Sequence, residues 1–553
     1  MDSQNIFKQK VVAYFCMEYA LERNINLYAG GLGILAGDYL KAAKDKGYPV
    51  VGIGILWKQG YTTQRIDRQG RVIDSYCNYK SEYGFLEDTG VTVDIRIKEE
   101  DVKCKVWKTE NFENNTLYLL DTDIPENNGT ELKWTTGQLY GGFEEQRIAQ
   151  EMVLGIGGIR ALRELGIRPD IYHFNEGHAV FAGFEIIREK LVSGMEFEQA
   201  LESTKKSIVF TTHTPVKQGN ESHSLRSLMY MGANDGLEAS ELKRIGGDPF
   251  NMTVAGLRLS KISNGVSRLH AQTANEMWRE IEGKSNIIQI TNGIHIPTWV
   301  NEDVIQNMDS DELLWGSHLK HKRLLIDYIY EKTGSKFKQD ILTIGFARRV
   351  VPYKRANLIM EYEPQLQKLM EAGKIQIVLS GKSHPLDDEG KLLVKKIHGF
   401  CKRYPKNTAF IQNYDIENAK ALTKGCDVWL NTPRKPYEAS GTSGMKAALN
   451  GVLNLSVLDG WWEEACIDGE NGWQFGDGLQ MKNDVQQDRH DGEALMKILL
   501  EKVIPTYYED RTKWVDMMRK SISTNIEHFD MKRTIDEYRE KMYDFQPELL
   551  KNT

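Results

Sequence analysis

Short runs of β-branched and other apolar residues alternate with longer helical patterns along nearly the whole chain. In the first half these runs lie at 11–18, 48–57, 170–175 and 207–215. In the second half they lie at 341–349, 375–381, 408–414, 427–432 and 453–460. Such runs are typical of strands that are buried on both faces of a parallel sheet, and the stretches between them supply crossover helices. The pattern therefore predicts an α/β fold made of βαβ units.

The length of 553 residues is more than one hydrophobic core usually organises, so we expect two doubly wound, Rossmann-like domains. We place the boundary in the charged helical stretch at 302–340, which gives an N-terminal domain of 1–310 and a C-terminal domain of 311–553. The alternative for this stretch is a surface helix inside one larger domain. Two doubly wound domains usually bind ligands in the cleft that faces the carboxyl ends of their strands.

Two segments are expected to depart from this simple plan. Residues from about 75 to 130 are polar and only weakly alternating, which predicts an inserted antiparallel element in the N-terminal domain. The last helix, from about 525 to 547, is amphipathic, and we expect it to pack back on the first domain.

Charge and composition narrow the range of partners. The formal net charge of -7 argues against nucleic acid or an anionic membrane surface as the main partner. No run approaches the roughly 18 apolar residues of a membrane helix, and residues 1–15 lack the apolar core of a secretory signal. The 6 cysteines form no C-x-x-C pair, so neither a disulfide framework nor a zinc site is expected, and no other metal motif is present. We expect a cytoplasmic protein.

Near the N-terminus, the segment YAGGLGILAGD places Gly30, Gly31 and Gly33 between a predicted strand and a predicted helix. Glycines at such a position let backbone N–H groups approach an anion, and the helix N-terminus adds a favourable partial charge. The alternative is a tight turn that needs glycine for its backbone conformation alone. The spacing does not match a dinucleotide-binding fingerprint.

In the second half, FARRVVPYKR follows a predicted strand and carries four basic residues within eight positions: Arg348, Arg349, Lys354 and Arg355. Arginine suits bidentate contact with phosphate oxygens, whereas lysine acts as a compact point charge. A solvated basic face is the alternative. The position at the carboxyl end of a strand favours an anion site.

A third segment, EASGTSGMKAALNG at 438–451, places hydroxyl residues and glycines directly before Lys446. Such a loop can cradle a phosphate, and lysine is the residue that forms Schiff bases with carbonyl cofactors such as pyridoxal phosphate. The alternative is an N-capping loop with Lys446 directed to water.

Two histidines, His178 in NEGHAVF and His213 in TTHTP, each follow a predicted strand. Either side chain could bond a sugar hydroxyl or move a proton, and either could instead be a core histidine whose hydrogen bonds are satisfied.

Taken together in chain order, these segments resemble the α-glucan phosphorylase family, which comprises glycogen, starch and maltodextrin phosphorylases. The glycine loop, the basic run and the Lys446 loop carry most of the resemblance. Weaker matches join them: YFCMEYAL, DIYHFNEGH, THTP, ITNGI, LSGKSHP and FIQNYDIENA. The set runs from about residue 12 to 480 and therefore covers most of the chain.

The resemblance implies a GT-B glycosyltransferase architecture, with two Rossmann-like domains facing a cleft that holds pyridoxal 5'-phosphate. It implies reversible phosphorolysis of the non-reducing-end glucosyl unit of an α-1,4-glucan or maltodextrin. Inorganic phosphate is the second substrate, and α-glucose 1-phosphate is released with retention of configuration. The cofactor's phosphate would exchange a proton with the substrate phosphate, so the paired carboxylates of ordinary glycosidases are not required. Closure around the site would exclude water and favour phosphorolysis over hydrolysis.

The resemblance also implies the roles of individual residues. Lys446 would hold the cofactor as a Schiff base. Further cofactor contacts would come from Arg348, Thr442, Ser443, Gly30 and Gly31. Arg349, Lys354 and the N–H of Gly31 would bind the substrate phosphate. The glucosyl unit would contact Glu438, Ser440, Gly441, His213 and His178.

In three respects the chain differs from the family's usual pattern. After ITNGI it continues HIPTWVNEDV instead of the family's usual sequence, so one expected sugar contact has no counterpart. The chain matches a short form without the N-terminal regulatory extension, because its glycine loop begins at residue 30. Gly444 stands where most members have an asparagine before the Met-Lys pair. A homodimer is implied by the resemblance alone.

Three alternatives follow from the same residues. A sugar-nucleotide-dependent glycosyltransferase such as glycogen or starch synthase would share the fold, the glycine loop and a glutamate like Glu438. It would have no use for Lys446 or for a cofactor. The second alternative is a non-catalytic glucan-binding protein. Such a protein would be expected to have lost residues of the phosphate site, whereas Gly31, Arg349 and Lys354 are all present. The third alternative is a phosphorylase of the same fold that acts on a different disaccharide.

Overall fold

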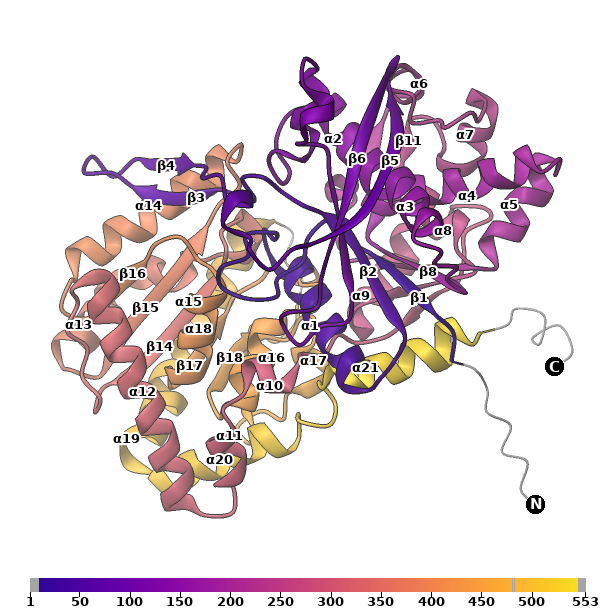
Figure 1. The fold of residues 1–553 in the computed structure, drawn as a ribbon. Helices are drawn as coiled ribbons and strands as arrows, with labels where there is room; N and C mark the ends of the chain where they lie inside the picture. The colour runs from indigo at the N-terminus through magenta and orange to yellow at the C-terminus, as the bar shows by residue number, and fades with distance from the viewer. Residues whose placement is uncertain (1–8, 480, 482, 546–553) are drawn as a thin grey trace, which may run out of the picture.

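The computed structural model describes residues 9–479, 481 and 483–545, which form a mixed α/β structure with two large sheets (Figure 1). The expected α/β fold with parallel sheets is confirmed. Residues 1–8, which belong to the segment analysed for a secretory signal, lie outside the described residues. Across the described residues, no helix is both long and apolar enough to cross a membrane.

The first sheet has nine strands, of which seven neighbouring strands, counted from one edge, are parallel. In spatial order the strands are β13 (Ile287–Gln289), β12 (Ile262–Gly265), β9 (Ile208–Thr211), β8 (Ile171–Asn175), β1 (Val12–Phe15), β2 (Val50–Ile55), β7 (Leu117–Asp121), β6 (Glu100–Thr109) and β5 (Glu87–Ile97). The last two continue the sheet by antiparallel pairing. The segment from 75 to 130 thus extends this sheet at one edge.

The second sheet has six strands, all parallel. Their order is β16 (Thr408–Ile411), β15 (Ile375–Lys382), β14 (Leu342–Arg349), β17 (Val428–Asn431), β18 (Leu453–Val457) and β19 (Gly472–Phe475). In the second sheet the chain builds outward from β14 to β16 and then from β17 to β19 on the other side. In the first sheet β1 and β2 are followed by β5, β6 and β7, which return from the edge toward β2, and β8, β9, β12 and β13 then extend the other side. The direction reverses between β1 and β8 and between β14 and β17, and such switch points are where open α/β sheets bind ligands.

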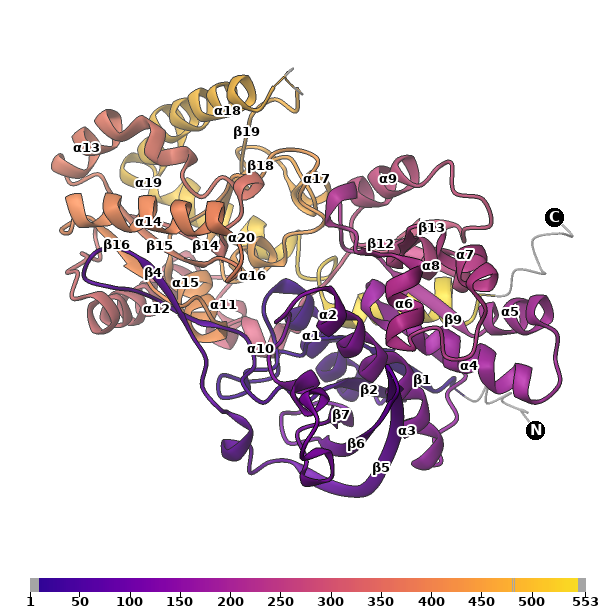
Figure 2. The same cartoon turned by 90° about the horizontal axis from the view of Figure 1, so that it is seen from above.

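Helices connect the strands of both sheets (Figures 1 and 2). Those before residue 300 are α1 (Gly31–Asp45), α2 (Glu144–Met152), α3 (Gly158–Glu164), α4 (Phe181–Val192), α5 (Phe197–Lys205), α6 (Leu225–Met231), α7 (Ala239–Gly246), α8 (Met252–Leu259), α9 (Arg268–Met277) and α10 (Ile296–Trp299). The later ones are α11 (Glu302–Gln306), α12 (Asp311–Thr333), α13 (Glu363–Glu371), α14 (Asp388–Arg403), α15 (Ile416–Gly425), α16 (Thr442–Leu449), α17 (Trp462–Ala465), α18 (Asp484–Ile498), α19 (Ile504–Glu509), α20 (Arg511–Ser523) and α21 (Met531–Tyr538).

The end of the chain returns to the first sheet. Figure 1 shows α21 beside α1, and its apolar residues Met531 and Ile535 join the core around that sheet. The Tyr543 hydroxyl, which follows α21, lies 2.6 Å from the Tyr39 hydroxyl and 2.8 Å from His173 Nδ1. Residues 546 and 547 of the expected last helix lie outside the described residues.

One hairpin from the first half reaches the second sheet. Strands β3 (Thr63–Ile66) and β4 (Val72–Ser75) pair antiparallel, and Figure 1 shows them beside α14. Gln64 Nε2 donates to the Ser383 carbonyl at 3.3 Å, and the Ile66 N–H donates to Gln412 Oε1 at 2.8 Å. The hairpin therefore ties the two halves of the chain together close to the end of β15.

Candidate functional site

The predicted site residues gather at the carboxyl ends of strands beside the two switch points. Arg348 and Arg349 end β14, and Glu438 lies in the loop that follows β17. Gly30 and Gly31 lie between β1 and β2, at the start of α1, while His178 and His213 follow β8 and β9. The parallel topology thus places these loops at one edge of each sheet.

Glu438 forms the centre of a buried charge cluster. Its carboxylate accepts hydrogen bonds from Arg348 Nη2 and, at 2.6 Å, from Lys354 Nζ. Burial raises the pKa of Glu438, but the two cations overcome that effect and lower it to about 2. Glu438 is therefore ionised at any physiological pH, and Arg348 and Lys354 are held in one place without a bound anion.

Arg349 differs from its neighbour Arg348 because it is exposed to solvent. The surrounding protein displaces part of the water around the guanidinium, which lowers its pKa. Tyr353, Tyr61 and Glu18 act in the opposite direction and hold the pKa above its usual value. Tyr61 comes from the first half of the chain, so Arg349 faces residues from both halves. An exposed guanidinium in this setting is available to an anion.

The glycine loop is held by Glu18, a residue that the sequence analysis did not single out. Its Oε2 accepts the N–H groups of Ala29 at 2.7 Å and Gly30 at 3.0 Å, and its Oε1 accepts the Tyr140 hydroxyl at 2.6 Å. A Cβ atom added at Gly30 or Gly31 would meet nothing within 4 Å, and α1 carries neither a side-chain cap nor an acid in its first turn. The start of α1 therefore presents free N–H groups to open space.

The remaining glycines of this segment serve packing instead. A Cβ atom at Gly33 would lie 2.6 Å from the Tyr28 Cβ, and one at Gly37 would lie 1.9 Å from the Ala20 carbonyl oxygen. Close approach of the backbone explains these two positions, whereas it does not explain Gly30 and Gly31.

The loop before Lys446 leads directly into α16. Gly441 has a φ of 91°, which L-residues other than glycine rarely adopt, and it precedes the first turn without a side-chain cap. Thr442 and Ser443, at the first two positions of the helix, are partly exposed. Ser440 is buried, and its hydroxyl makes no hydrogen bond within the described part of the chain. Most buried hydroxyls have a partner, so the Ser440 hydroxyl is available to a polar ligand.

Lys446 itself is 4% exposed, so the alternative in which it points to water is wrong. Its Nζ lies 3.4 Å from the centroid of the Trp299 ring. Burial lowers the pKa of Lys446 to about 8, against the opposing effect of Asp38. A lysine with this pKa exists partly as the neutral amine near pH 7, which is the form that attacks a carbonyl.

The structure accounts for glycine at position 444. A Cβ atom there would lie 2.8 Å from Trp461 Nε1 and 2.8 Å from Asn454 Oδ1. Trp461 and Asn454 are both buried, and Asn454 Nδ2 donates to the Gly444 carbonyl at 3.1 Å. The indole thus occupies the volume that an asparagine at position 444 would need.

His213 and His178 are both held neutral. Burial lowers the pKa of His213 to about 3 and that of His178 to about 4. His213 Nε2 lies 2.6 Å from Asn175 Oδ1, so this nitrogen donates and Nδ1 remains an acceptor. Among the described residues, no hydrogen bond or ion pair joins either histidine to the Lys446 loop.

Glu176 supports this part of the site and was not expected from the sequence. It occupies a φ of 77° after β8, and its Oε2 accepts the His213 N–H at 2.7 Å. Burial raises the pKa of Glu176 to about 7. A non-glycine residue in such a conformation is typical of functional loops.

A cluster around His178 offers three atoms of the kind that bind metals. Ligand atoms of His178, Glu151 and Glu221 lie within 4.8 Å of one another. Arg147 already donates to both carboxylate oxygens of Glu221, at 3.2 and 2.8 Å. Arginine therefore supplies the positive charge that a metal would otherwise bring.

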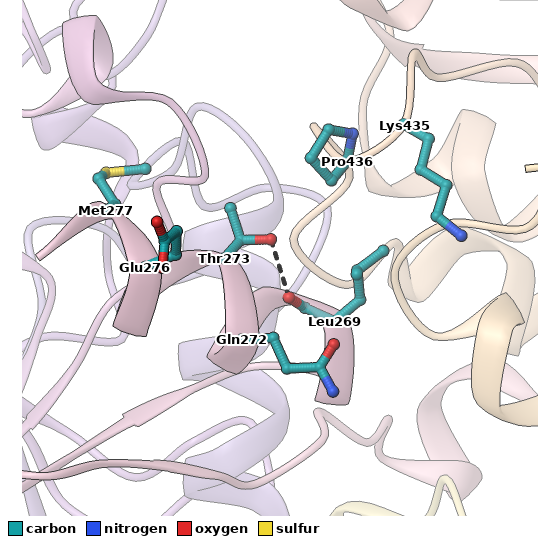
Figure 3. Close-up of a pocket in the computed structure, with 7 residues that line it drawn as sticks. All are labelled: Leu269, Gln272, Thr273, Glu276, Met277, Lys435 and Pro436. Atoms are coloured by element: carbon teal, nitrogen blue, oxygen red, sulfur yellow. Dashed lines mark hydrogen bonds between the residues drawn. The ribbon is translucent and has the colours of Figure 1, made fainter. Parts of the chain in front are cut away.

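A hydrogen bond between α9 and α17 connects the first and second halves of the chain. The Arg268 N–H at the start of α9 donates to Glu464 Oε1 in α17 at 2.8 Å, and Figure 2 shows these two helices facing each other. Next to them is a groove of about 460 Å³ (Figure 3). It is lined by Leu269, Gln272, Thr273, Glu276, Met277, Lys435 and Pro436. The groove contains none of the predicted site residues, although Pro436 precedes Glu438 by only two positions.

Known proteins of one family are similar to this chain. The family model for carbohydrate phosphorylases matches residues 302–498. A maltodextrin phosphorylase of Thermococcus litoralis is 37% identical over 97% of this chain and 70% of its own length. Glycogen phosphorylases of Aquifex aeolicus and Mycobacterium bovis are 34% and 36% identical over 97% and 93% of this chain, and over 86% and 68% of their own lengths. With such identity over most of both sequences, the chain belongs to the carbohydrate phosphorylase family.

Proposed function

We propose that the protein is an α-1,4-glucan phosphorylase that depends on pyridoxal 5'-phosphate. It transfers the non-reducing-end glucosyl unit of a glucan or maltodextrin to inorganic phosphate and releases α-glucose 1-phosphate. The observation that carries the proposal is the buried Lys446, whose pKa is lowered to about 8 behind a loop with an unpartnered hydroxyl. The names of the relatives, maltodextrin and glycogen phosphorylase, support the substrate class.

The proposed architecture is a pair of Rossmann-like domains in a GT-B arrangement, divided near residue 310. Each sheet has its own switch point, which supports a ligand site between them. Hydrogen bonds from Gln64 to Ser383, from Ile66 to Gln412 and from Arg268 to Glu464 connect residues on both sides of that boundary.

Residues at the end of β14 and in α16, on the side of the second sheet, fit the cofactor. Lys446 would hold its aldehyde carbon, and the free N–H groups at Thr442 and Ser443 would bind its phosphate at the start of α16. Arg348 would assist, because its Nε is buried and makes no hydrogen bond among the described residues. When bound, pyridoxal phosphate would supply a phosphate group that exchanges a proton with the substrate phosphate.

The substrate phosphate would bind between the two halves. Arg349 is exposed and Lys354 ends a short helical turn, so both can reach an anion. The free N–H of Gly31 would complete the site from the opposite side. Two phosphates that lie close together repel each other, and this set of cations and N–H dipoles offsets that repulsion.

The glucosyl unit would lie against Glu438, Ser440 and Gly441. Glu438 stays ionised and accepts hydroxyl hydrogen bonds, while the unpartnered Ser440 hydroxyl is free to bond a sugar oxygen. Neutral His213 would accept a hydroxyl hydrogen bond at Nδ1, and His178 would lie nearby.

In the reaction, the substrate phosphate would donate its proton to the glucosidic oxygen as the bond to the anomeric carbon breaks. One of its oxygens would then bond to that carbon on the same face. The residues of this chain hold the phosphate, neutralise its charge and exclude water from the oxocarbenium-like state.

Attachment of the cofactor tests the proposal. After loading with pyridoxal phosphate and treatment with borohydride, the cofactor should be bound to one peptide, the one that contains Lys446. Lys382, a half-buried lysine whose pKa burial also lowers to about 8, provides a control, because it donates to the Thr62 carbonyl and should stay unlabelled. Glucosyl transfer from a sugar nucleotide by unlabelled protein would instead support the synthase alternative.

A further inference from the structure

Trp299 links Lys446 to Asp38, the last residue of the YAGGLGILAGD segment, and the resemblance assigns a role to neither Trp299 nor Asp38. Trp299 Nε1 donates to both carboxylate oxygens of Asp38, at 2.9 Å each. The face of the same indole lies over Lys446, with Nζ 3.4 Å from the ring centroid. Asp38 is 3% exposed and Trp299 is fully buried. One aromatic ring therefore contacts an acid through its N–H and a cation through its face.

This arrangement has a physical consequence for the lysine. A hydrogen bond from the indole N–H to a carboxylate increases the electron density of the ring, because hydrogen-bonded groups polarise one another at low dielectric. A ring richer in electrons attracts a cation over its face more strongly. The negative charge of Asp38 acts in the same direction. Both effects favour the protonated form of Lys446, whereas burial opposes it.

We propose that Asp38 is a positioning residue, which acts through the indole of Trp299 to hold the nitrogen of Lys446 at the point where the cofactor attaches. The inference rests on the proposed function, because it assumes that Lys446 carries the cofactor. It assigns a role to α1 in addition to that of its first glycines. The helix presents N–H groups at one end and, two turns later, the acid that orients the lysine.

Other charged groups near Lys446 define the expected titration. Lys420 in α15 lies 6.0 Å from the centroid of the same Trp299 ring, and its charge lowers the pKa of Lys446. Burial raises the pKa of Asp38, an effect that Lys446, Trp299 and His295 oppose, and Lys41 lies one turn further along α1. Asp38 and Lys420 thus act on Lys446 with opposite sign.

The test measures how fast Lys446 of the full-length apoprotein reacts with pyridoxal phosphate at a series of pH values. Borohydride traps the product, and mass spectrometry quantifies the Lys446 peptide. Asp38→Asn keeps an oxygen for the indole but removes the charge, and it should lower the pH midpoint of labelling by about one unit. Lys420→Met should raise the midpoint. Trp299→Phe removes the N–H and should lower it.

The controls separate this role from general stability and from the cofactor assignment. Asp45→Asn removes another acid from α1, one that pairs with Lys532 at 2.9 Å, and should leave the midpoint unchanged. An unchanged midpoint in Asp38→Asn, with normal labelling of the wild type, overturns the role of Asp38. The double variant provides a further test. If Asp38→Asn shifts the pH midpoint by its full amount even when Trp299 is already phenylalanine, the effect of Asp38 does not pass through the indole, and that part of the proposal is overturned. Absence of Lys446 labelling in the wild type at every pH overturns the cofactor assignment, and this inference with it.

Discussion

Replacing Glu438 by glutamine should weaken the fold and strengthen anion binding at the same time. The carboxylate is the shared partner of Arg348 and Lys354 in a buried cluster. Glutamine has nearly the same shape but no charge, so both cations would be left without their counter-ion. A phosphate or sulfate ion could then take the place of the carboxylate.

The size of the effect follows from the pKa of Glu438. A fall from 4.5 to about 2 corresponds to about 3 kcal/mol of preference for the ionised form in the folded protein. Because the folded-state pKa is depressed, this stability is present above pH 4.5 and is lost as the pH falls toward about 2. Loss of most of it should lower the Tm by roughly 2 to 6 °C at pH 7.

Thermal unfolding with and without inorganic phosphate measures both effects. Without phosphate, Glu438→Gln should unfold at a lower temperature than the wild type at pH 7, and the difference should shrink below pH 4.5. With phosphate, the variant should recover more of its Tm than the wild type gains. Asp488→Asn is the matched control: Asp488 also pairs with two cations, Arg434 and Arg355, but these keep the acid partners Asp484 and Asp491, so the variant should show no such recovery. Equal phosphate responses in Glu438→Gln and the wild type would refute the reasoning.

Three further predictions concern single residues. Gly31→Ala should keep the wild-type Tm, since nothing lies within 4 Å of the added Cβ, but should raise the KM for phosphate in initial-rate assays. Gly444→Ala should instead lose about 1 to 3 kcal/mol of stability through overpacking against Trp461, measured as a lower Tm; an unchanged Tm would show that the indole can move aside. Arg349→Ala should reduce kcat/KM for phosphate and for glucose 1-phosphate by roughly 10- to 150-fold, as expected for loss of a charged hydrogen bond. Unchanged phosphate kinetics in Arg349→Ala would place the anion site elsewhere.

The strands that could be predicted are those buried on both faces. The apolar runs at 341–349 and 427–432, for example, contain β14 and β17. The strands that were missed are short or mixed in character. β12, with the sequence ISNG, and β13, with IIQ, owe their strand conformation to pairing with β9 and with each other, which local composition does not reveal.

Candidate site residues could be proposed from the sequence where the proposed function depends on residue type within one short segment. The glycines at 30 and 31, the arginines at 348 and 349 and the lysine at 446 are of this kind. Their supports are distant in sequence: Asp38 and Trp299 are 261 positions apart, and Arg348 and Glu438 are 90 apart. Only the folded chain brings such pairs together. A buried acid within an amphipathic helix, as at Asp38 in α1, is the one local signal that could have been noticed.

Phosphate-dependent release of glucose 1-phosphate from maltodextrins of graded length tests the central claim most directly. The protein loaded with pyridoxal phosphate should form one glucose 1-phosphate for each phosphate consumed, and the Lys446→Ala variant should form none. Release of free glucose independent of phosphate, or full activity in Lys446→Ala, would contradict the account.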